Sequence, residues 1–536
     1  MIADESDAPE DFGKMIYNKE MKKTRRDSLF CTLIFAFSAV LLGLLAVLCL
    51  FNRSLLSMHG GEFSRITRNG GFFIGITVLF LLAVVPGYRL LLRRLPDPKK
   101  LFICCLILHF FFGFFLIFNV NTKLSFDAKK IYDGMRAYIA RDYSEFRICA
   151  YFSNFPNQLG MLTYERILNA YSSNIRFFFM CNLLMTGGIH FFQWKISENL
   201  FPNRKGAQVL TILFSFAFLP VLFLSLWVYS DIPGLFFMMG ALFCGVKAAF
   251  SNEKRYWFPM IVSAVISCLL RQNQLIPWIA FTISAGLFLI RENRKRVLLP
   301  LLCVFPLLWI SGNIQLNAYR NTTGMPLGNG IPNGLWVARG LQDESEKGIN
   351  PGWYSDLNWT THIHNHCDPD GGAQEANKMI AESLEKFRND PRAASAFFMN
   401  KIKTTWCDPT FQSLWYSPLH IEGGVMENPL LCSLRGENGG ILYKGTVLGL
   451  NVLMVLLFVF GALGCFILCS RMDLKREILL FSVLSFCGVF LFHLIWETKS
   501  RYVFSAVYQL IPVAAIGIEG LLKKHCVDDL EGSRGD

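Results

Sequence analysis

The stretch LFCTLIFAFSAVLLGLLAVLCLF, residues 29–51, decides the class of this fold because it is apolar throughout and carries no charged side chain. A run of roughly 20 apolar residues is long enough to cross the hydrocarbon core of a bilayer as a helix. Comparable blocks recur along the chain, and we predict about twelve spanning helices on that length criterion. They are expected near residues 29–51, 72–91, 101–120, 175–194, 207–226, 230–250, 256–270, 275–291, 297–316, 448–470, 478–494 and 502–522.

The overall composition agrees with a membrane protein. The chain has 536 residues, of which 53% are hydrophobic and only 17% are charged, whereas about a quarter of a typical soluble domain is charged. The net charge of +12 could indicate a nucleic-acid partner, but the basic residues occur in short clusters between apolar blocks and therefore indicate topology. We expect an all-α polytopic protein of the cell membrane, with the lipid bilayer as its surroundings and no nucleic-acid partner.

The basic clusters orient the predicted spans. Cytoplasmic loops carry an excess of Lys and Arg, and twelve crossings place every cluster and both termini on the cytoplasmic side. The segment 156–172 is the exception to a simple count, because it either crosses the membrane or lies at the interface. Glu165 and Arg166 inside it favour the interface. The clusters occur at residues 22–26, 93–100, 204–205, 254–255, 291–296, 475–476 and 523–524.

This topology divides the chain into parts. Two polar regions are predicted to face outward, an outer loop at 121–174 and an extracytoplasmic domain at 317–447 that is either α+β or mainly helical. The second region is long enough to be a small domain. The remaining parts are a cytoplasmic N-terminal segment at 1–28, a transmembrane catalytic module at 29–316 that includes the first outer region, C-terminal transmembrane helices at 448–522 and a cytoplasmic tail at 523–536.

Asp127 is the first candidate for a functional residue. It closes the stretch NTKLSFD, which follows the third predicted span at its outer end. An ordinary exposed loop carboxylate is the alternative for this residue alone. A carboxylate at the mouth of a membrane helix, followed by the segment YFSNFPNQLG from Tyr151, indicates chemistry at the membrane surface.

Further ionisable residues occur where the topology places other outer helix ends. Asp231 lies in WVYSDIPG, Arg271 in LLRQNQ, and Glu497 and Arg501 in WETKSRY. Ionisable groups near the hydrocarbon are costly and often functional, and two arginines with nearby carboxylates could serve a base and a phosphate-bearing substrate. The alternatives are that Asp231 caps a helix before Pro233 and that the arginines extend toward the interface.

Two weaker signals remain in the 317–447 region. His362, His364 and His366 alternate, so that on a strand they would share one face and could bind a metal, but a polar loop is favoured because no fourth ligand has a fixed spacing. Cys367, Cys407 and Cys432 could pair two by two, although no spacing compels a pairing. The other cysteines mostly lie in apolar runs, where Cys acts as a small hydrophobic residue.

With an acidic residue in the first outer loop after a membrane helix, the chain resembles the polyprenyl-phosphate-sugar-dependent glycosyltransferases of the membrane GT-C class. This class includes the protein O-mannosyltransferases and the aminoarabinose transferase. The Tyr-Ser-Asp-x-Pro element at residues 229–233 and the Glu-x-Lys-Ser-Arg-Tyr element at 497–502 are similar to those of uncharacterised bacterial members. The outer-region stretches PGWY at 351–354 and WCDPTFQSLW at 406–415 are similar too. The resemblance covers most of residues 100–520.

This resemblance implies that Asp127 is the base that activates an acceptor hydroxyl. The sugar would come from a polyprenyl-phosphate-linked donor and pass, with inversion, to a cell-envelope glycan, lipid or protein on the extracytoplasmic face. Ala128 stands where many relatives carry a second acid, so we predict no metal ligand and no certain cofactor, and a divalent metal stays unsupported. The predicted donor-phosphate and substrate residues are Asp231, Arg271, Glu497, Arg501 and Tyr502.

The region 317–447 contains five tryptophans, which suit stacking on sugar rings but equally suit a packed core. We assign Trp353 and Trp406 to acceptor binding. The rival function is a transporter or flippase of lipid-linked sugars, which would need inverted repeats or broken helices in matching halves. Neither pattern is visible, and no nucleotide-binding motif indicates a cytoplasmic nucleotide-sugar enzyme. We therefore expect a membrane glycosyltransferase.

Overall fold

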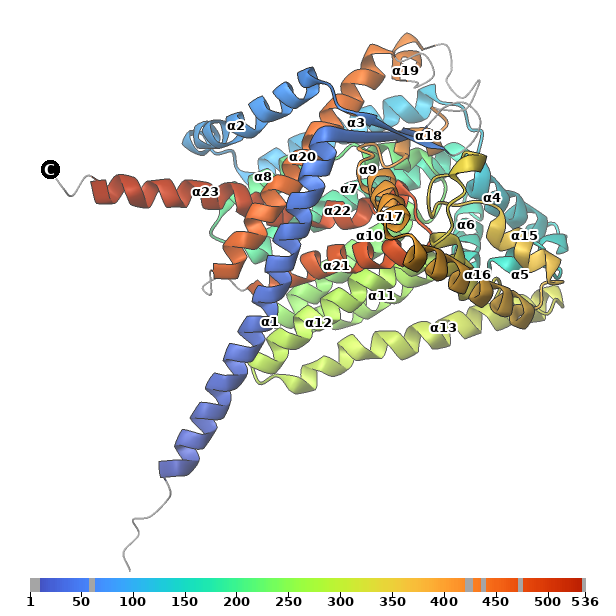
Figure 1. Cartoon of the computed structure of the whole chain (residues 1–536), viewed down its shortest axis with the longest axis horizontal. Helices are drawn as coiled ribbons and strands as arrows, with labels where there is room; N and C mark the ends of the chain where they lie inside the picture. Colours follow the sequence, from blue (N-terminus) through green and yellow to red (C-terminus); the bar gives the residue numbers. More distant parts are fainter. Residues whose placement is uncertain (1–9, 57–62, 420–427, 435–439, 471–475, 533–536) are drawn as a thin grey trace, which may run out of the picture.

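The computed structural model describes residues 10–56, 63–419, 428–434, 440–470 and 476–532, and helices dominate this part of the chain (Figure 1). Ten of the described helices are long and apolar enough to span a membrane, or eleven if the bent pair Lys205–Ala217 and Pro220–Leu226 counts as one span. The ten correspond to α1 (Glu10–Phe51), α2 (Gly71–Arg93), α3 (Pro98–Asn119), α7 (Ile175–Leu200), α10 (Asp231–Gly245), α12 (Leu275–Arg291), α13 (Leu299–Thr323), α20 (Ile441–Ser470), α21 (Arg476–Ile495) and the pair α22 (Phe504–Gln509) and α23 (Ile511–Gly532).

The helix packing confirms an all-α, multi-pass membrane protein. The central helices are mostly buried in the protein. In the segment Asp231–Phe250, which begins with α10, 78% of the most apolar 18-residue stretch is buried. By contrast, only 11% of the corresponding stretch of the peripheral helix α13 is buried, and its Trp309 is 71% exposed. Such continuous apolar exposure would be unstable in water, and a lipid bilayer is the solvent that accommodates it.

The helix α11 (Trp257–Leu270) is the predicted span that falls short in length. At 1.5 Å per residue its 14 residues cover roughly 21 Å. Its first end lies near the contact between Arg294 and Asn252, whereas its last end carries Arg271, which bonds to Asp231. The helix therefore joins the two ends of the molecule, although twelve full crossings stay a prediction.

Loops assigned to the same side contact one another. On the predicted cytoplasmic side, Arg204 pairs with Glu519 at 3.3 Å and Arg291 pairs with Glu477. At the opposite end, the backbone N–H of Ser54 donates to the carbonyl of Cys407 at 2.8 Å. Figure 1 shows the helices of the two predicted outer regions gathered at one end, away from the C-terminus. The contacts fit the predicted parity of the loops.

The region 317–447 is mainly helical where it is described, which decides between the two alternatives for it. Strands occur elsewhere among the described residues: β1 (Asn52–Leu56) and β2 (Ser64–Arg68) form an antiparallel hairpin with Asn52 opposite Arg68. This hairpin between the first two spans was not predicted. The helices of the region are α14 (Asn333–Gly340), α15 (Leu357–His364), α16 (Pro369–Asn389), α17 (Pro391–Trp406), α18 (Ser413–Tyr416) and α19 (Pro429–Leu434).

The first outer region is a compact set of short helices. It contains α4 (Phe126–Ile139), α5 (Tyr151–Asn154) and α6 (Leu159–Asn169). With 11 residues, α6 is too short to span the membrane, so the interfacial interpretation of 156–172 fits and the transmembrane alternative does not. Gly160 lets α6 approach the backbone of Leu269 so closely that a Cβ would collide with it.

A disulfide joins the two outer regions. Cys149 of the first region pairs with Cys367 of the second, across 218 residues of sequence. The pairing that the sequence left open among Cys367, Cys407 and Cys432 does not form: Cys407 is buried with its sulfur 3.5 Å from that of Cys49, and Cys432 is an exposed free thiol. Disulfides persist in oxidising compartments, which agrees with an extracytoplasmic position for both regions.

Candidate functional site

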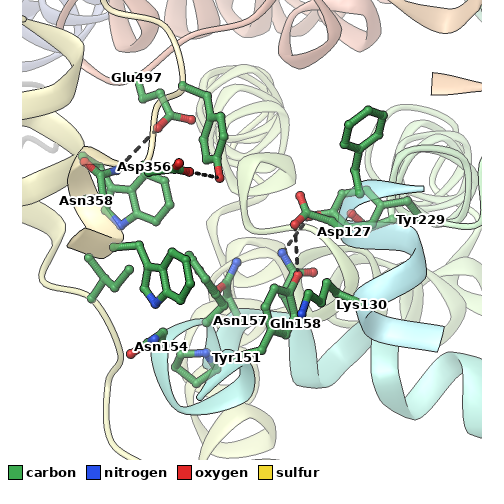
Figure 2. Close-up of a pocket in the computed structure, with 18 of the residues that line it drawn as sticks. Asp127, Lys130, Tyr151, Asn154, Asn157, Gln158, Tyr229, Asp356, Asn358 and Glu497 are labelled. Atoms are coloured by element: carbon green, nitrogen blue, oxygen red, sulfur yellow. Dashed lines mark hydrogen bonds between the residues drawn. The ribbon is translucent and has the colours of Figure 1, made fainter. Parts of the chain in front are cut away.

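A cavity of about 1220 Å³ lies at the end of the molecule where the two outer regions meet. Figure 2 shows polar side chains around it, with Asp127 and Tyr229 on one side and Glu497 and Asn358 on the other. Loops at helix ends supply most of this lining, so that segments far apart in sequence converge here. The lining comes mainly from residues 126–158, 229–230, 270–273, 329–359 and 493–502, with Tyr416 added.

Asp127 lines this cavity from the first turn of α4. The residue before it, Phe126, has a φ of 51°, a conformation that is rare outside glycine. The ring of Phe126 stacks on Trp415 with the centroids 4.6 Å apart, which holds the turn in place. The residue is half-buried, and it lies at the positive end of the α4 dipole.

Two tyrosines flank the carboxylate of Asp127. The hydroxyl of Tyr151 donates to Asp127 Oδ1 at 3.3 Å, and the side-chain amide of Gln158 donates to the hydroxyl of Tyr229 at 2.7 Å. Burial raises the pKa of Tyr151 well above its usual value, and the negative charge of Asp127 adds to this shift. The same two causes raise the pKa of Tyr229. Both phenols therefore stay protonated and serve as hydrogen-bonding groups around the acid.

Asp231, Arg271 and Arg501 form what we call the paired cluster. Asp231 Oδ1 lies 2.8 Å from Arg271 Nη1, and Oδ2 lies 2.9 Å from Arg501 Nη1. The side chains of Asp231 and Arg501 are only 1% and 2% exposed, and that of Arg271 is 10% exposed. The arginines therefore do not extend to the lipid interface, and Asp231 serves two ion pairs. One carboxylate facing two guanidinium groups leaves a net charge of +1 in a buried position.

Aromatic rings enclose the guanidinium of Arg501. Its central carbon lies 4.1 Å from the ring centroid of Tyr416 and 5.1 Å from that of Tyr229. The ring of Tyr502 lies 5.6 Å away. Cation–π contacts of this kind stabilise a desolvated cation. Because Arg501 and Arg271 both line the cavity, the paired cluster presents fixed positive charge to whatever occupies it.

Asp408 supports this cluster from the second outer region. Its carboxylate accepts hydrogen bonds from the Ser500 hydroxyl at 2.6 Å, from the backbone and hydroxyl of Thr410, and from the backbone N–H of Gln412. Burial raises the pKa of the Asp408 carboxyl, and these hydrogen bonds oppose the shift. The contact to Ser500 fixes the residue next to Arg501. Sequence reasoning noticed the surrounding stretch but assigned Asp408 no role.

Glu497 lines the cavity and is linked to the paired cluster through Tyr502, whose ring lies 5.9 Å from the guanidinium carbon of Arg271. Its two carboxylate oxygens accept from the Tyr502 hydroxyl at 3.3 Å and from the Asn358 side-chain amide at 3.4 Å. Its backbone N–H donates to the carbonyl of Trp336 at 3.1 Å. The buried ammonium group of Lys401 donates to the carbonyls of Leu494 and Trp496, each at 2.9 Å, and to that of Gly340 at 2.5 Å. Lys401 thereby holds the segment around Leu494 and Trp496, which precedes Glu497, in place.

The two tryptophans assigned to acceptor binding do not reach the cavity. Trp353 is fully buried and donates from its indole N–H to the hydroxyl of Thr404 at 3.0 Å. Trp406 is 2% exposed and packs its ring 5.0 Å from Phe486. Both therefore stabilise the fold. The indoles that line the cavity belong to Trp336, Trp359 and Trp496.

The alternating histidines do not share one face. His362 and His364 lie on the helix α15, where residues two apart point in different directions. His362 is buried, and His366 is followed by the disulfide-bonded Cys367. Within the described part of the chain, no group of three or more His, Cys, Asp or Glu side chains is arranged to hold a metal ion.

Tertiary structure brings the remaining predicted residues together. Asp127, Arg271, Glu497, Arg501 and Tyr502 line one cavity, and Asp231 lies directly behind both arginines. Sequence reasoning missed the surrounding Tyr151, Gln158, Tyr229 and Tyr416. Only Tyr229 lies at a predicted outer helix end, and the stretches around Tyr151 and Gln158 were quoted without a role for these residues. No protein-family model matches the chain, and no curated protein sequence matches it.

Proposed function

We propose that this protein is a membrane glycosyltransferase that moves a sugar from a polyprenyl-phosphate-linked donor to a hydroxyl group at the extracytoplasmic face. The observation that carries the proposal is the meeting of a half-buried carboxylate, Asp127, and two buried arginines, Arg271 and Arg501, in one cavity. This reaction needs a base that accepts the proton of the acceptor hydroxyl and a cationic site that stabilises the leaving phosphate, both at the same cavity.

In the proposed reaction, Asp127 accepts the proton of the acceptor hydroxyl. The hydroxyl oxygen forms a bond to C1 of the sugar from the face opposite the leaving group. The bond between C1 and the phosphate oxygen breaks, and its electron pair leaves with the lipid phosphate. The product is a glycoside of inverted configuration at C1, together with a free polyprenyl phosphate.

The paired cluster suits the leaving phosphate. Its two guanidinium groups share one carboxylate, so that a net positive charge remains for an incoming anion. Arginine donors match phosphate oxygens through two parallel hydrogen bonds. Because Asp231 and the rings around Arg501 hold both groups in place before substrate arrives, little reorganisation is needed as charge develops on the phosphate.

The direct test is an assay of the purified protein in liposomes with a panel of polyprenyl-phosphate-linked sugars. We expect release of the sugar from its lipid in the wild type. Asp127→Asn should lower the rate of transfer on the order of 10²–10⁴-fold, the usual cost of removing a positioned base. A matched control is Asp370→Asn, because Asp370 also lies in the first turn of a helix but is exposed and outside the cavity.

The outcomes separate the rival functions. If the wild type and Asp127→Asn transfer the sugar at the same rate, Asp127 is not the base. Movement of an intact lipid-linked sugar across the bilayer, with no cleavage of the bond at C1, would instead establish the transporter or flippase alternative.

A further inference from the structure

The side of the cavity that carries Asn358 has a chemistry of its own. We call it the open wall and define it by Asn154, Trp336, Asp356, Asn358 and Trp359, all of which line the cavity. A backbone hydrogen bond joins the two outer regions that form this wall, because Ile331 N–H donates to the carbonyl of Asn154 at 3.0 Å. The inference drawn from it rests on the proposed function and extends it to the acceptor.

Two buried amides of the open wall have an unused oxygen. Asn358 is 3% exposed and Asn154 is 2% exposed, yet Oδ1 of each has no hydrogen-bond partner. The orientation of each amide is fixed by its nitrogen, which donates to Glu497 in the case of Asn358 and to the carbonyl of Cys149 in the case of Asn154. A buried acceptor without a partner costs free energy. Both residues line the cavity, and the hydroxyl groups of a bound ligand are one source of the missing donors.

Exposed aromatic surface lies beside these acceptors. Trp359 is 46% exposed, on a helix outside the predicted spans, and Trp336 is half-buried. An indole offers a large apolar face with a polar edge and is often found where a ligand has both characters. Sugar rings have such a character, because their C–H faces are apolar and their rims carry hydroxyls.

The carboxylates and amide oxygens of the open wall are hydrogen-bond acceptors. Asp356 lines it, and Glu497 stands directly behind Asn358. Such oxygens accept hydrogen bonds but do not donate them, so the hydroxyl groups of a ligand match them. A donor phosphate would occupy the positively charged paired cluster, which leaves the open wall to a hydroxyl-rich group.

The size of the cavity agrees with two substrates. Its volume of about 1220 Å³ exceeds the roughly 300–1,000 Å³ of pockets that hold a single drug-sized ligand. A peptide acceptor fits the wall less well, because every residue of a peptide presents a carbonyl acceptor beside its N–H donor. We propose that the open wall binds a carbohydrate and that the acceptor hydroxyl of this transferase belongs to a sugar.

The experiment measures binding of neutral trisaccharides, namely cellotriose, maltotriose and chitotriose, to the full-length protein in nanodiscs by saturation-transfer NMR without any donor. We expect at least one to bind the wild type. Trp359→Ala should weaken that binding roughly two- to tenfold, the range for one aromatic contact, whereas Trp359→Phe should retain most of it. Trp309→Ala is the matched control, because Trp309 is exposed on α13 away from the cavity.

Each outcome decides the proposal. Absence of binding by all three sugars, or binding that Trp359→Ala leaves unchanged, overturns the carbohydrate site. Binding of a Ser- and Thr-containing peptide, with no binding of any of the three sugars, also overturns it and makes the acceptor a protein. Cleavage of the lipid-linked donor in the same preparation is measured separately. Sugar binding without donor cleavage supports the site and contradicts the transferase, while donor cleavage without sugar binding leaves the transferase and removes the site.

Discussion

The paired cluster and the open wall face one cavity but are built in opposite ways. In the cluster, Asp231 contacts both arginines at 2.8 and 2.9 Å, and its side chain is 1% exposed. In the wall, Asn358 keeps a buried oxygen without a partner and Trp359 is 46% exposed. The ion pairs of the first arrangement are already formed, whereas the second keeps an acceptor open. The difference teaches that charge is preorganised at the paired cluster, while the open wall keeps acceptors and aromatic surface open.

The largest expected effect breaks the paired cluster. Asp231→Ala leaves two buried guanidinium groups without a counter-charge, and loss of one partner of a buried pair costs about 3–5 kcal/mol of folding free energy. Asp356→Ala on the open wall should change it by less than about 0.5 kcal/mol, because Asp356 is exposed. Unfolding in mixed detergent micelles measures both. Equal losses would show that the two regions do not differ in the way described.

The second effect sharpens the role of the cluster. Arg501→Lys keeps the charge but loses the planar fork that grips phosphate through two donors. If one charged hydrogen bond is lost, kcat/KM for the lipid-linked donor should fall roughly 10- to 100-fold. Arg65→Lys is the control, because Arg65 is exposed on β2 and outside the cavity. Unchanged donor kinetics in both Arg501→Lys and Arg271→Lys would assign the arginines to structure alone.

The last effect is the smallest per pH unit and concerns Lys401, which holds the segment that carries Glu497. Burial lowers the pKa of Lys401 from 10.5 to about 7. Between these values the unfolded chain binds more protons than the folded one, so this group makes the free energy of unfolding rise with pH from about 7 to 10.5. The slope is at most about 1.4 kcal/mol per pH unit. Lys401→Met should remove it, and identical slopes in variant and wild type would contradict the argument.

The amino-acid sequence predicted where the helices end better than it predicted which side chains contact one another. Asp127, Arg271 and Arg501 were predicted to meet because each follows or precedes an apolar block on the same side, and a topology of crossings places such ends together. The same reasoning assigned Trp353 and not Trp359 to acceptor binding, although both lie in one polar region and no pattern distinguishes them. Their burial, complete for the first and partial for the second, depends on how α15 and α17 pack.

Sequence by itself determined the membrane class and the position of most of the long apolar helices, whereas the side of each loop stays a prediction from the basic clusters. These follow from local properties, because a long apolar block must bury its backbone hydrogen bonds in a helix wherever it lies. Only the tertiary structure decided that Cys149 pairs with Cys367, that Asp408 holds Ser500 and that Asn154 and Asn358 keep unused oxygens in one cavity. Such contacts join residues far apart in the chain, and no spacing within the sequence encodes which side chains packing will bring together.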